Sequence, residues 1–412
     1  MKRWGFAGAM IAVLLIAANL RAPISSVGPV LGLVGEDLSL NSTWLGVLAG
    51  VPLLSFAIFS PFAHTLGRKL GLERAILVAL VVTLVGVIIR PWAGPLVTFP
   101  SVNLWVGTAL IGAGVAVANV LLPVVIKRDF PHKIALVTAL YTAIMAALAS
   151  TAAGVVVTLS KINTGTGPWG WRGALLATGA LLVPAIAVWL VHMRSRVLAA
   201  AQDPEPAATE TAPAARLKLF RVPLAWQVTV NMGLQSLVFF VMATWLPAVS
   251  QSYGRSQEQA GIDLMVYILT GVAGSLIAPY FLRGTTQQLP AVMWPTVVAL
   301  SVVGIMVVPG AMLLWLTLAG ISASGCLVTA LSLIGLRSSN FHTASALSAM
   351  TQSIGYLIAA FGPVMIGSLF NRTGTWALSL GAVVVICLIE AAVGYFAGRN
   401  KLVDEAASLR AS

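Results

Sequence analysis

Charged residues are scarce in this chain of 412 residues: they make up 9% of it, whereas 58% of the residues are hydrophobic. Soluble globular proteins carry about a quarter charged residues, so that class of protein is excluded. The mean hydropathy is +0.95. The hydrophobic residues suffice for about twelve spans of roughly 20 residues, the length at which a helix crosses a bilayer. The sequence therefore predicts a polytopic membrane protein that has the lipid bilayer as its partner.

Cysteine and histidine are also rare. The two cysteines, Cys326 and Cys387, lie within apolar segments, and the four histidines are scattered near the ends of expected helices. A free thiol in such a segment behaves as a small hydrophobe, and the spacing typical of metal ligands is not found. We therefore expect no disulfide, no metal site and no cofactor.

Acidic residues number twelve against 24 lysines and arginines, which gives a net charge of +12. In a soluble chain this balance would suggest that the protein binds nucleic acid. Here the positive charges fall between apolar runs, where they indicate membrane orientation, and we expect no nucleic acid partner.

Apolar runs of about 18 residues or more alternate with polar breaks, and each run predicts a membrane-spanning helix. Only the Pro309-Gly310 break separates the ninth run from the tenth. The twelve expected helices cover approximately residues 5–34, 43–64, 74–90, 103–126, 134–160, 172–192, 223–247, 260–282, 291–309, 311–336, 343–370 and 375–397.

Positive charges are distributed unequally between the two sides of the membrane. When the loops are assigned alternately, eighteen of the 24 lysines and arginines fall on one side and five, including Arg90, on the other. Lysine and arginine resist translocation, so the richer side should be the cytoplasm, with both termini inside. The first run resembles a signal peptide but has no small-residue cleavage site, and we interpret it as the first helix. We expect a multi-pass protein of a bacterial-type cytoplasmic (inner) membrane.

A polar stretch rich in proline, alanine and acidic residues interrupts the chain near its middle. Such a composition cannot bury a core and predicts a cytoplasmic linker. The expected organisation is an N-terminal six-helix half over 1–192, the linker over 193–222, a C-terminal six-helix half over 223–399 and a cytoplasmic tail over 400–412.

The two halves show a weak internal repeat at an offset of 211 residues. Phe130 matches Phe341 at this offset, and Asp129 pairs with Asn340 in the same loop. Parallel six-helix repeats joined by a cytoplasmic linker are typical of one group of secondary transporters. The predicted fold class is an all-α polytopic membrane protein whose 12 helices form two six-helix pseudo-repeats.

The loop after the second expected helix resembles a motif of the major facilitator superfamily. The loop after the second helix there usually reads Gly-x-x-x-Asp-Arg-x-Gly-x-Arg-Arg. Here residues 64–74 keep Lys69, Gly71 and Arg74, but Arg68 replaces the Asp. The resemblance implies the major facilitator fold, and Arg68 and Lys69 are candidates for gating.

The first helix resembles one branch of that superfamily more closely. It contains Asn19-Leu20-Arg21-Ala22-Pro23 and then Val27-Gly28-Pro29. This looks like the cyanate permease and 2-nitroimidazole transporter branch. The resemblance implies small anionic or small polar heteroaromatic substrates and transport by alternating access.

Arg21 is the main candidate for substrate binding. Sixteen residues from Gly5 place it about 24 Å along the first helix, near the bilayer midplane. A guanidinium group there costs several kcal/mol unless it faces a wet cavity or a partner. Arg21 either contacts the substrate or braces neighbouring helices by donating hydrogen bonds to backbone carbonyls near Pro23 and Pro29.

Acidic partners for Arg21 are few, because only Asp263 and Glu390 lie within expected helices. Asp263 begins the eighth helix, where it could gate the transporter or, as we favour, cap the helix. Glu390 lies in the twelfth helix, which the superfamily resemblance places at the periphery. It therefore faces an interface or, as the alternative, carries a proton. A midplane arginine without an evident acid leaves positive potential in the cavity, which favours a bound anion.

Polar residues near the middles of the helices that line the cavity in the superfamily fold complete the candidate site. Residues 231 and 235, like 352 and 356, are spaced i, i+4 and so share a helix face. The alternative for each is an inter-helix hydrogen bond worth about 1 kcal/mol. The candidate substrate-binding residues are Arg21, Ser25, Asn119, Tyr141, Asn231, Gln235, Gln352 and Tyr356.

Three functions compete on these observations. The first is a secondary transporter that moves a small anion or small polar molecule, similar to cyanate, around Arg21. The second is efflux of a 2-nitroimidazole-like heteroaromatic, with Tyr267 and Phe239 stacking on it. A membrane enzyme is the third, but it would need clustered acids, histidines or a metal, and no HExxH or Walker motif is present. We expect a non-enzymatic monomer with a small-molecule, anionic substrate, and proton coupling, exchange or neither remains open.

Overall fold

The computed structural model describes residues 6–92, 100–130, 134–163, 167–202, 219–339 and 341–403. Within these residues the regular structure is helical, and twelve spans are long and apolar enough to cross a membrane. This confirms the all-α fold with twelve spans. The break at Pro309-Gly310 is present as a short 3-10 turn, η3 (Pro309–Ala311).

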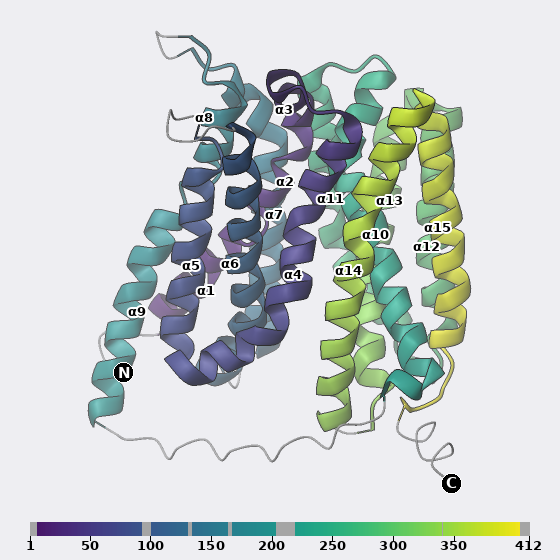
Figure 1. Cartoon of the computed structure of the whole chain (residues 1–412). Helices are drawn as coiled ribbons and strands as arrows, with labels where there is room; N and C mark the ends of the chain where they lie inside the picture. The colour runs from purple at the N-terminus through teal and green to yellow at the C-terminus, as the bar shows by residue number, and fades with distance from the viewer. Residues whose placement is uncertain are drawn as a thin grey trace.

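The first group of helices lies at the left of Figure 1. It consists of α1 (Phe6–Asn19), α2 (Ala22–Ser25), η1 (Gly28–Val30), α3 (Leu31–Leu38), α4 (Ser42–Leu70), α5 (Leu72–Ile89), α6 (Pro100–Asp129), α7 (Ile134–Ser160), α8 (Gly170–Ala177) and α9 (Leu182–Gln202).

The second group lies at the right of Figure 1. It consists of η2 (Leu219–Arg221), α10 (Pro223–Ser252), α11 (Gln257–Phe281), α12 (Gln288–Val307), η3, α13 (Met312–Leu336), α14 (Phe341–Thr373) and α15 (Trp376–Ala397). Helix α1 begins and α15 ends on the same side of the molecule, at the bottom of Figure 1. We call this the terminal side and the other the opposite side.

Two spans are interrupted where the sequence predicts single helices. The first, expected over 5–34, is divided into α1, α2, η1 and α3, and the sixth, expected over 172–192, turns at residues 178–181 between α8 and α9. Helix α9 also continues past Met193 to Gln202. Residues 203–218 of the expected linker lie outside the described residues.

The two groups of helices pack closely on the opposite side. Helices α4 and α14 converge there and separate toward the terminal side (Figure 1). A Cβ atom at Gly46 would clash with the carbonyl oxygen of Pro363, and one at Gly50 would lie 2.8 Å from that of Ala360. Gly46 and Gly50 therefore let α4 approach the backbone of α14 closely.

Helices α7 and α11 form a second contact between the groups on the same side. The Ser150 hydroxyl donates to the Met265 carbonyl oxygen at 3.0 Å, and Lys161 forms an ion pair with Glu258.

A charge cluster joins α5, α6 and α9 on the terminal side. Arg128 contacts Glu73 at 2.5 Å and Asp129 at 2.7 Å, and His192 Nε2 lies 3.3 Å from Asp129 Oδ2. Burial raises the pKa of Asp129, but hydrogen bonds from His192 and Arg128 and the charges of Arg128 and Arg196 outweigh this and lower it to about 2. The Asp129 carboxylate is therefore ionised and ties the three helices together.

Replacing Gly46 by alanine should destabilise the contact between α4 and α14, because the added methyl group meets the backbone of α14. Overpacking of this kind costs about 1–3 kcal/mol. Thermal unfolding of the purified protein measures the effect. Gly32→Ala is the matched control, since a Cβ there meets open space. Equal melting temperatures for the two variants would contradict the prediction.

Asp129→Asn should lower thermal stability by about 1–3 kcal/mol, because buried donors of the charge cluster lose their charged acceptor. The pKa of Asp129 is lowered in the folded state from 3.8 to about 2. Its contribution is therefore present above pH 3.8 and is lost as the pH falls toward 2. The stability gap between wild type and Asp129→Asn should narrow over that interval, whereas Glu36→Gln, at an exposed position, should show no such gap.

Candidate functional site

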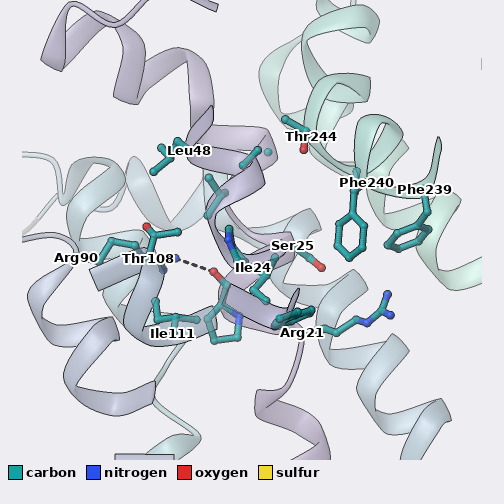
Figure 2. Close-up of a pocket in the computed structure, with 17 residues that line it drawn as sticks. Arg21, Ile24, Ser25, Leu48, Arg90, Thr108, Ile111, Phe239, Phe240 and Thr244 are labelled. Carbon is teal, nitrogen blue, oxygen red and sulfur yellow. Dashed lines mark hydrogen bonds between the residues drawn. The ribbon is translucent and has the colours of Figure 1, made fainter. Parts of the chain in front are cut away.

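A cavity lies where the broken first span meets α4, α6 and α10 (Figure 2). Its lining is mainly apolar, with a few polar side chains and two arginines. The lining residues are Arg21, Pro23, Ile24, Ser25, Val27, Gly28, Leu48, Ala49, Pro52, Phe56, Arg90, Thr108, Ile111, Phe239, Phe240, Ala243 and Thr244.

The break in the first span follows from its prolines. Pro23 and Pro29 carry no N–H group and cannot continue the hydrogen-bond ladder of an α-helix. The Val27 N–H, which would bond the Pro23 carbonyl in a regular helix, donates instead to Ile24 at 3.2 Å. The Pro23 carbonyl oxygen is therefore left without a partner in its own span.

Gly28 brings the break against α10. A Cβ atom at this position would clash with the carbonyl oxygen of Ala243 and lie 3.3 Å from that of Thr244. Only glycine allows this approach, which forms one wall of the cavity.

Arg21 lies in the turn between α1 and α2, and its half-buried side chain reaches α10. Its guanidinium carbon is 5.2 Å from the ring centroid of Phe239 and 5.9 Å from that of Phe240 (Figure 2). Both distances are within the range of a cation–π interaction. Among the described residues, no carboxylate forms an ion pair with Arg21.

Arg90 holds the carbonyl that the break exposes. Its Nη1 donates to the Pro23 carbonyl oxygen at 2.7 Å, and its Nη2 approaches that of Leu175 at 3.5 Å. Arg90, which was counted with the loop charges of the second side, directly follows the last residue of α5, and its side chain is buried with 2% exposed. The alternative role for Arg21 was to donate a hydrogen bond to a backbone carbonyl near Pro23. In the structure Arg90 donates that hydrogen bond.

Two tyrosines from different groups of helices approach Arg21. Tyr141 of α7 and Tyr356 of α14 both lie close enough to Arg21 to feel its positive charge. The Tyr356 ring also packs edge-on against Phe56 of α4, with 5.5 Å between centroids. Gln352, one turn before Tyr356, donates to Ser348 at 3.0 Å. Arg21, Tyr141 and Tyr356 thus form one group next to the cavity.

Other expected site residues divide between the cavity and the helix contacts around it. Ser25 lines the cavity, and Asn119 is half-buried in α6 without being part of the lining. The Gln235 amide donates to Ser236 at 2.6 Å. A Cβ atom at Gly394 of α15 would lie 3.1 Å from the amide nitrogen of Asn231, so Asn231 faces α15.

Asp263 does not cap its helix. The N-cap of α11 is Ser256, which accepts a hydrogen bond from the Gln259 N–H, so the capping interpretation is wrong. Asp263 is fully buried and forms a two-point ion pair with Arg255, at 2.5 and 2.8 Å. The pair lies at the opposite end of the molecule from the termini, where α11 packs on α7.

Glu390 is 2% exposed in α15 and interacts with the Cys326 thiol of α13. It is not part of the cavity lining. Lys69 is exposed at the terminal end of α4. The side chain of Arg68, the other gating candidate, lies outside what the structure describes.

The sequence interpretation missed several lining residues: Arg90, Thr108, Phe240 and Thr244. Phe240 adjoins Phe239, which was expected as a stacking residue. Thr108 and Thr244 resemble many other hydroxyl residues in apolar runs. The position of Arg90 in the sequence could have indicated a lining residue, because the side chain of an arginine directly after an apolar run can turn back into the protein.

The cavity carries an excess of positive charge. Arg21 and Arg90 both line it, and the residues that line it include no carboxylate. Within the described residues, no three His, Cys, Asp or Glu side chains are close enough to hold a metal ion. The arrangement is therefore suited to a ligand with negative charge or strong hydrogen-bond acceptors.

Comparison with known proteins connects this chain with transporters. The profile of the Major Facilitator Superfamily matches residues 9–363. The chain is 36% identical over 391 residues to the 2-nitroimidazole transporter of Escherichia coli (strain K12), covering 94% of this chain and 95% of the relative. It is 24% identical to the cyanate transport protein of the same organism, covering 92% and 95%.

The fold also matches a solved structure. A bacterial homolog of the human lysosomal transporter Spinster superposes with a TM-score of 0.76 at 16% identity, covering 97% of this chain and 98% of that one. The profile match agrees with the superfamily that the sequence resembles, and the 2-nitroimidazole and cyanate transporters agree with the branch. The chain belongs to the major facilitator superfamily.

Proposed function

We propose that this protein is a secondary transporter that moves a small anion or small polar molecule by alternating access around Arg21. The observation that carries the proposal is the Arg21 guanidinium, which lines a cavity and packs on Phe239 without an acidic partner among the described residues. A cation in a membrane protein that lacks a fixed counter-charge is a binding site by default.

The geometry around Arg21 leaves its hydrogen-bonding edge available. A guanidinium group is planar: its face can stack on an aromatic ring while its N–H groups bind two oxygen atoms in the plane. In Arg21 the rings of Phe239 and Phe240 lie against the face of the guanidinium group. The N–H edge then suits a carboxylate, a nitro group or another small acceptor.

Two relatives support this substrate class. One is named for 2-nitroimidazole and the other for cyanate. A nitro group and the cyanate ion both present electron-rich atoms to a donor, although only cyanate carries a full negative charge. A guanidinium group on an aromatic wall accommodates both. We favour a small anion as the substrate.

Efflux of a neutral heteroaromatic is the second candidate, because the cavity has an aromatic wall. Tyr267 stacks on Phe239 with 6.0 Å between centroids, and Phe240 packs edge-on against Phe239 at 5.2 Å. A planar ring would gain from stacking on this wall, and charge recognition by Arg21 would matter less.

Alternating access would move the six-helix halves, 1–192 and 223–399, against each other. The contacts of Gly46 with Pro363 and of Ser150 with Met265 close the side opposite the termini. With both termini in the cytoplasm, as the charge distribution indicates, this arrangement faces inward. The buried Arg255–Asp263 pair also lies at the closed end, but both residues belong to the second half, so the pair does not itself hold the two halves together.

Coupling and assembly are part of the same proposal. The cavity lining contains no carboxylate that could exchange a proton with the substrate, so exchange of one anion for another is the simplest mode of operation. Glu390 remains a candidate for proton coupling through its buried carboxyl group. We propose a monomer in the inner membrane.

Arg21→Gln should reduce anion uptake into proteoliposomes by about 10- to 100-fold, the value of one or two lost hydrogen bonds to a charged group. The panel is cyanate, nitrite, short carboxylates and 2-nitroimidazole, measured with and without a pH gradient. Arg283→Gln is the matched control, because Arg283 packs on Tyr280 at 5.1 Å outside the cavity. Unchanged saturable anion uptake by Arg21→Gln would refute charge recognition by Arg21.

Phe239→Leu should weaken transport of 2-nitroimidazole more than that of cyanate, because only the former has a ring to stack on the wall. A lost aromatic contact of about 0.5–1.5 kcal/mol corresponds to roughly a 3- to 10-fold rise in KM. Phe361→Leu, at an exposed position of α14, controls for the substitution itself. Equal effects on both substrates would show that Phe239 serves only to hold Arg21.

A further inference from the structure

Arg90 has a donor that its structural role does not use. Two of its nitrogen atoms contact the carbonyl oxygens of Pro23 and Leu175. The third, Nε, is buried and has no hydrogen-bond partner among the residues that the structure describes. A buried donor without an acceptor costs the protein the free energy of desolvating that donor. A bound ligand that supplies the acceptor would recover this free energy.

A second buried arginine, Arg337, shows how the nitrogen atoms of a purely structural arginine are bonded. Arg337 is also 2% exposed and also holds backbone carbonyls, on the terminal side. Its Nε donates to Ala397 at 2.9 Å, its Nη1 to Leu336 at 3.2 Å and its Nη2 to Gly398 at 3.0 Å. Arg337 thus has all three nitrogen atoms bonded, as a purely structural arginine should. Arg90 differs in its free Nε and in lining the cavity.

The two cavity arginines are well separated. Figure 2 shows Arg90 and Arg21 on opposite sides of the α2 segment, with Arg21 directed toward α10. The lining between them is largely apolar, and it includes Ile24, Leu48 and Phe240. A ligand that meets both cations therefore has an acceptor group at each end and an apolar body between them.

We propose that the Arg90 end of the cavity is a second anion-binding subsite, so that the protein prefers planar anions with an acceptor group at both ends. The preferred class is an aromatic acid with a second carboxylate or similar oxygen group across the ring. Arg21 binds one end and the Arg90 Nε–H the other. This proposal rests on the proposed function, because it assumes that Arg21 receives the first anionic group.

Titration calorimetry on the purified full-length protein tests this with two probes, benzoate and benzene-1,4-dicarboxylate. Wild type should bind the dicarboxylate about tenfold more tightly, the value of one charge-assisted hydrogen bond. Arg90→Gln should weaken binding of the dicarboxylate about tenfold more than binding of benzoate, which removes the preference. Arg337→Gln, the matched buried arginine, should keep the preference. These results would support the subsite.

Other outcomes overturn the subsite and separate it from the proposed function. Equal binding of the two probes by wild type, or binding of neither, refutes it without relying on any variant. Equal weakening of both probes by Arg90→Gln means that Arg90 only holds the backbone. If binding of cyanate is lost in Arg21→Gln while the two aromatic probes behave alike in wild type, the proposed function stands and the subsite falls.

Discussion

The hydrogen bond between Arg90 and the Pro23 carbonyl is the interaction on which the cavity depends. A carbonyl without a partner inside a membrane protein costs several kcal/mol, because no water is available to replace the missing N–H. Pro23 and Pro29 make such a carbonyl unavoidable in the first span, and Arg90 supplies the donor at 2.7 Å. The broken span can then hold Arg21 in a turn rather than on the side of a continuous helix.

This arrangement divides the work between two arginines. The two Nη atoms of Arg90 hold backbone carbonyls and fix the broken span, whereas the N–H edge of Arg21 stays free to receive a substrate when the site is empty. Arg21 is held by aromatic faces, which leave its N–H groups available. The cation–π contacts are worth about 0.5–2 kcal/mol, enough to orient the side chain but weaker than an ion pair that an anion would have to break.

Length and hydropathy predicted the fold well, because each span must satisfy the same requirement of about 20 apolar residues. The site was harder to predict. Arg90 was counted with the loop charges because it ends an apolar run. The backbone carbonyls that its side chain binds lie 67 residues before it and 85 residues after it. Asn231 and Gln235 do share a helix face, but most residues of α10 are buried. With protein on every side of α10, periodicity alone could not tell which face meets the cavity.

The contacts between the two groups of helices on the opposite side are of a kind that can separate when the protein opens there. Gly46 and Gly50 let α4 approach the backbone of α14 closely, so the contact consists of many weak van der Waals interactions and is sensitive to small changes in helix position. The Arg255–Asp263 pair adds a stronger, directional interaction at the same end, but both partners lie in the second group of helices. Separation of the groups therefore breaks apolar contacts and the exposed Lys161–Glu258 pair, whereas the buried charge pair can stay intact. Opening on this side then does not require separating two buried charges, which would cost several kcal/mol.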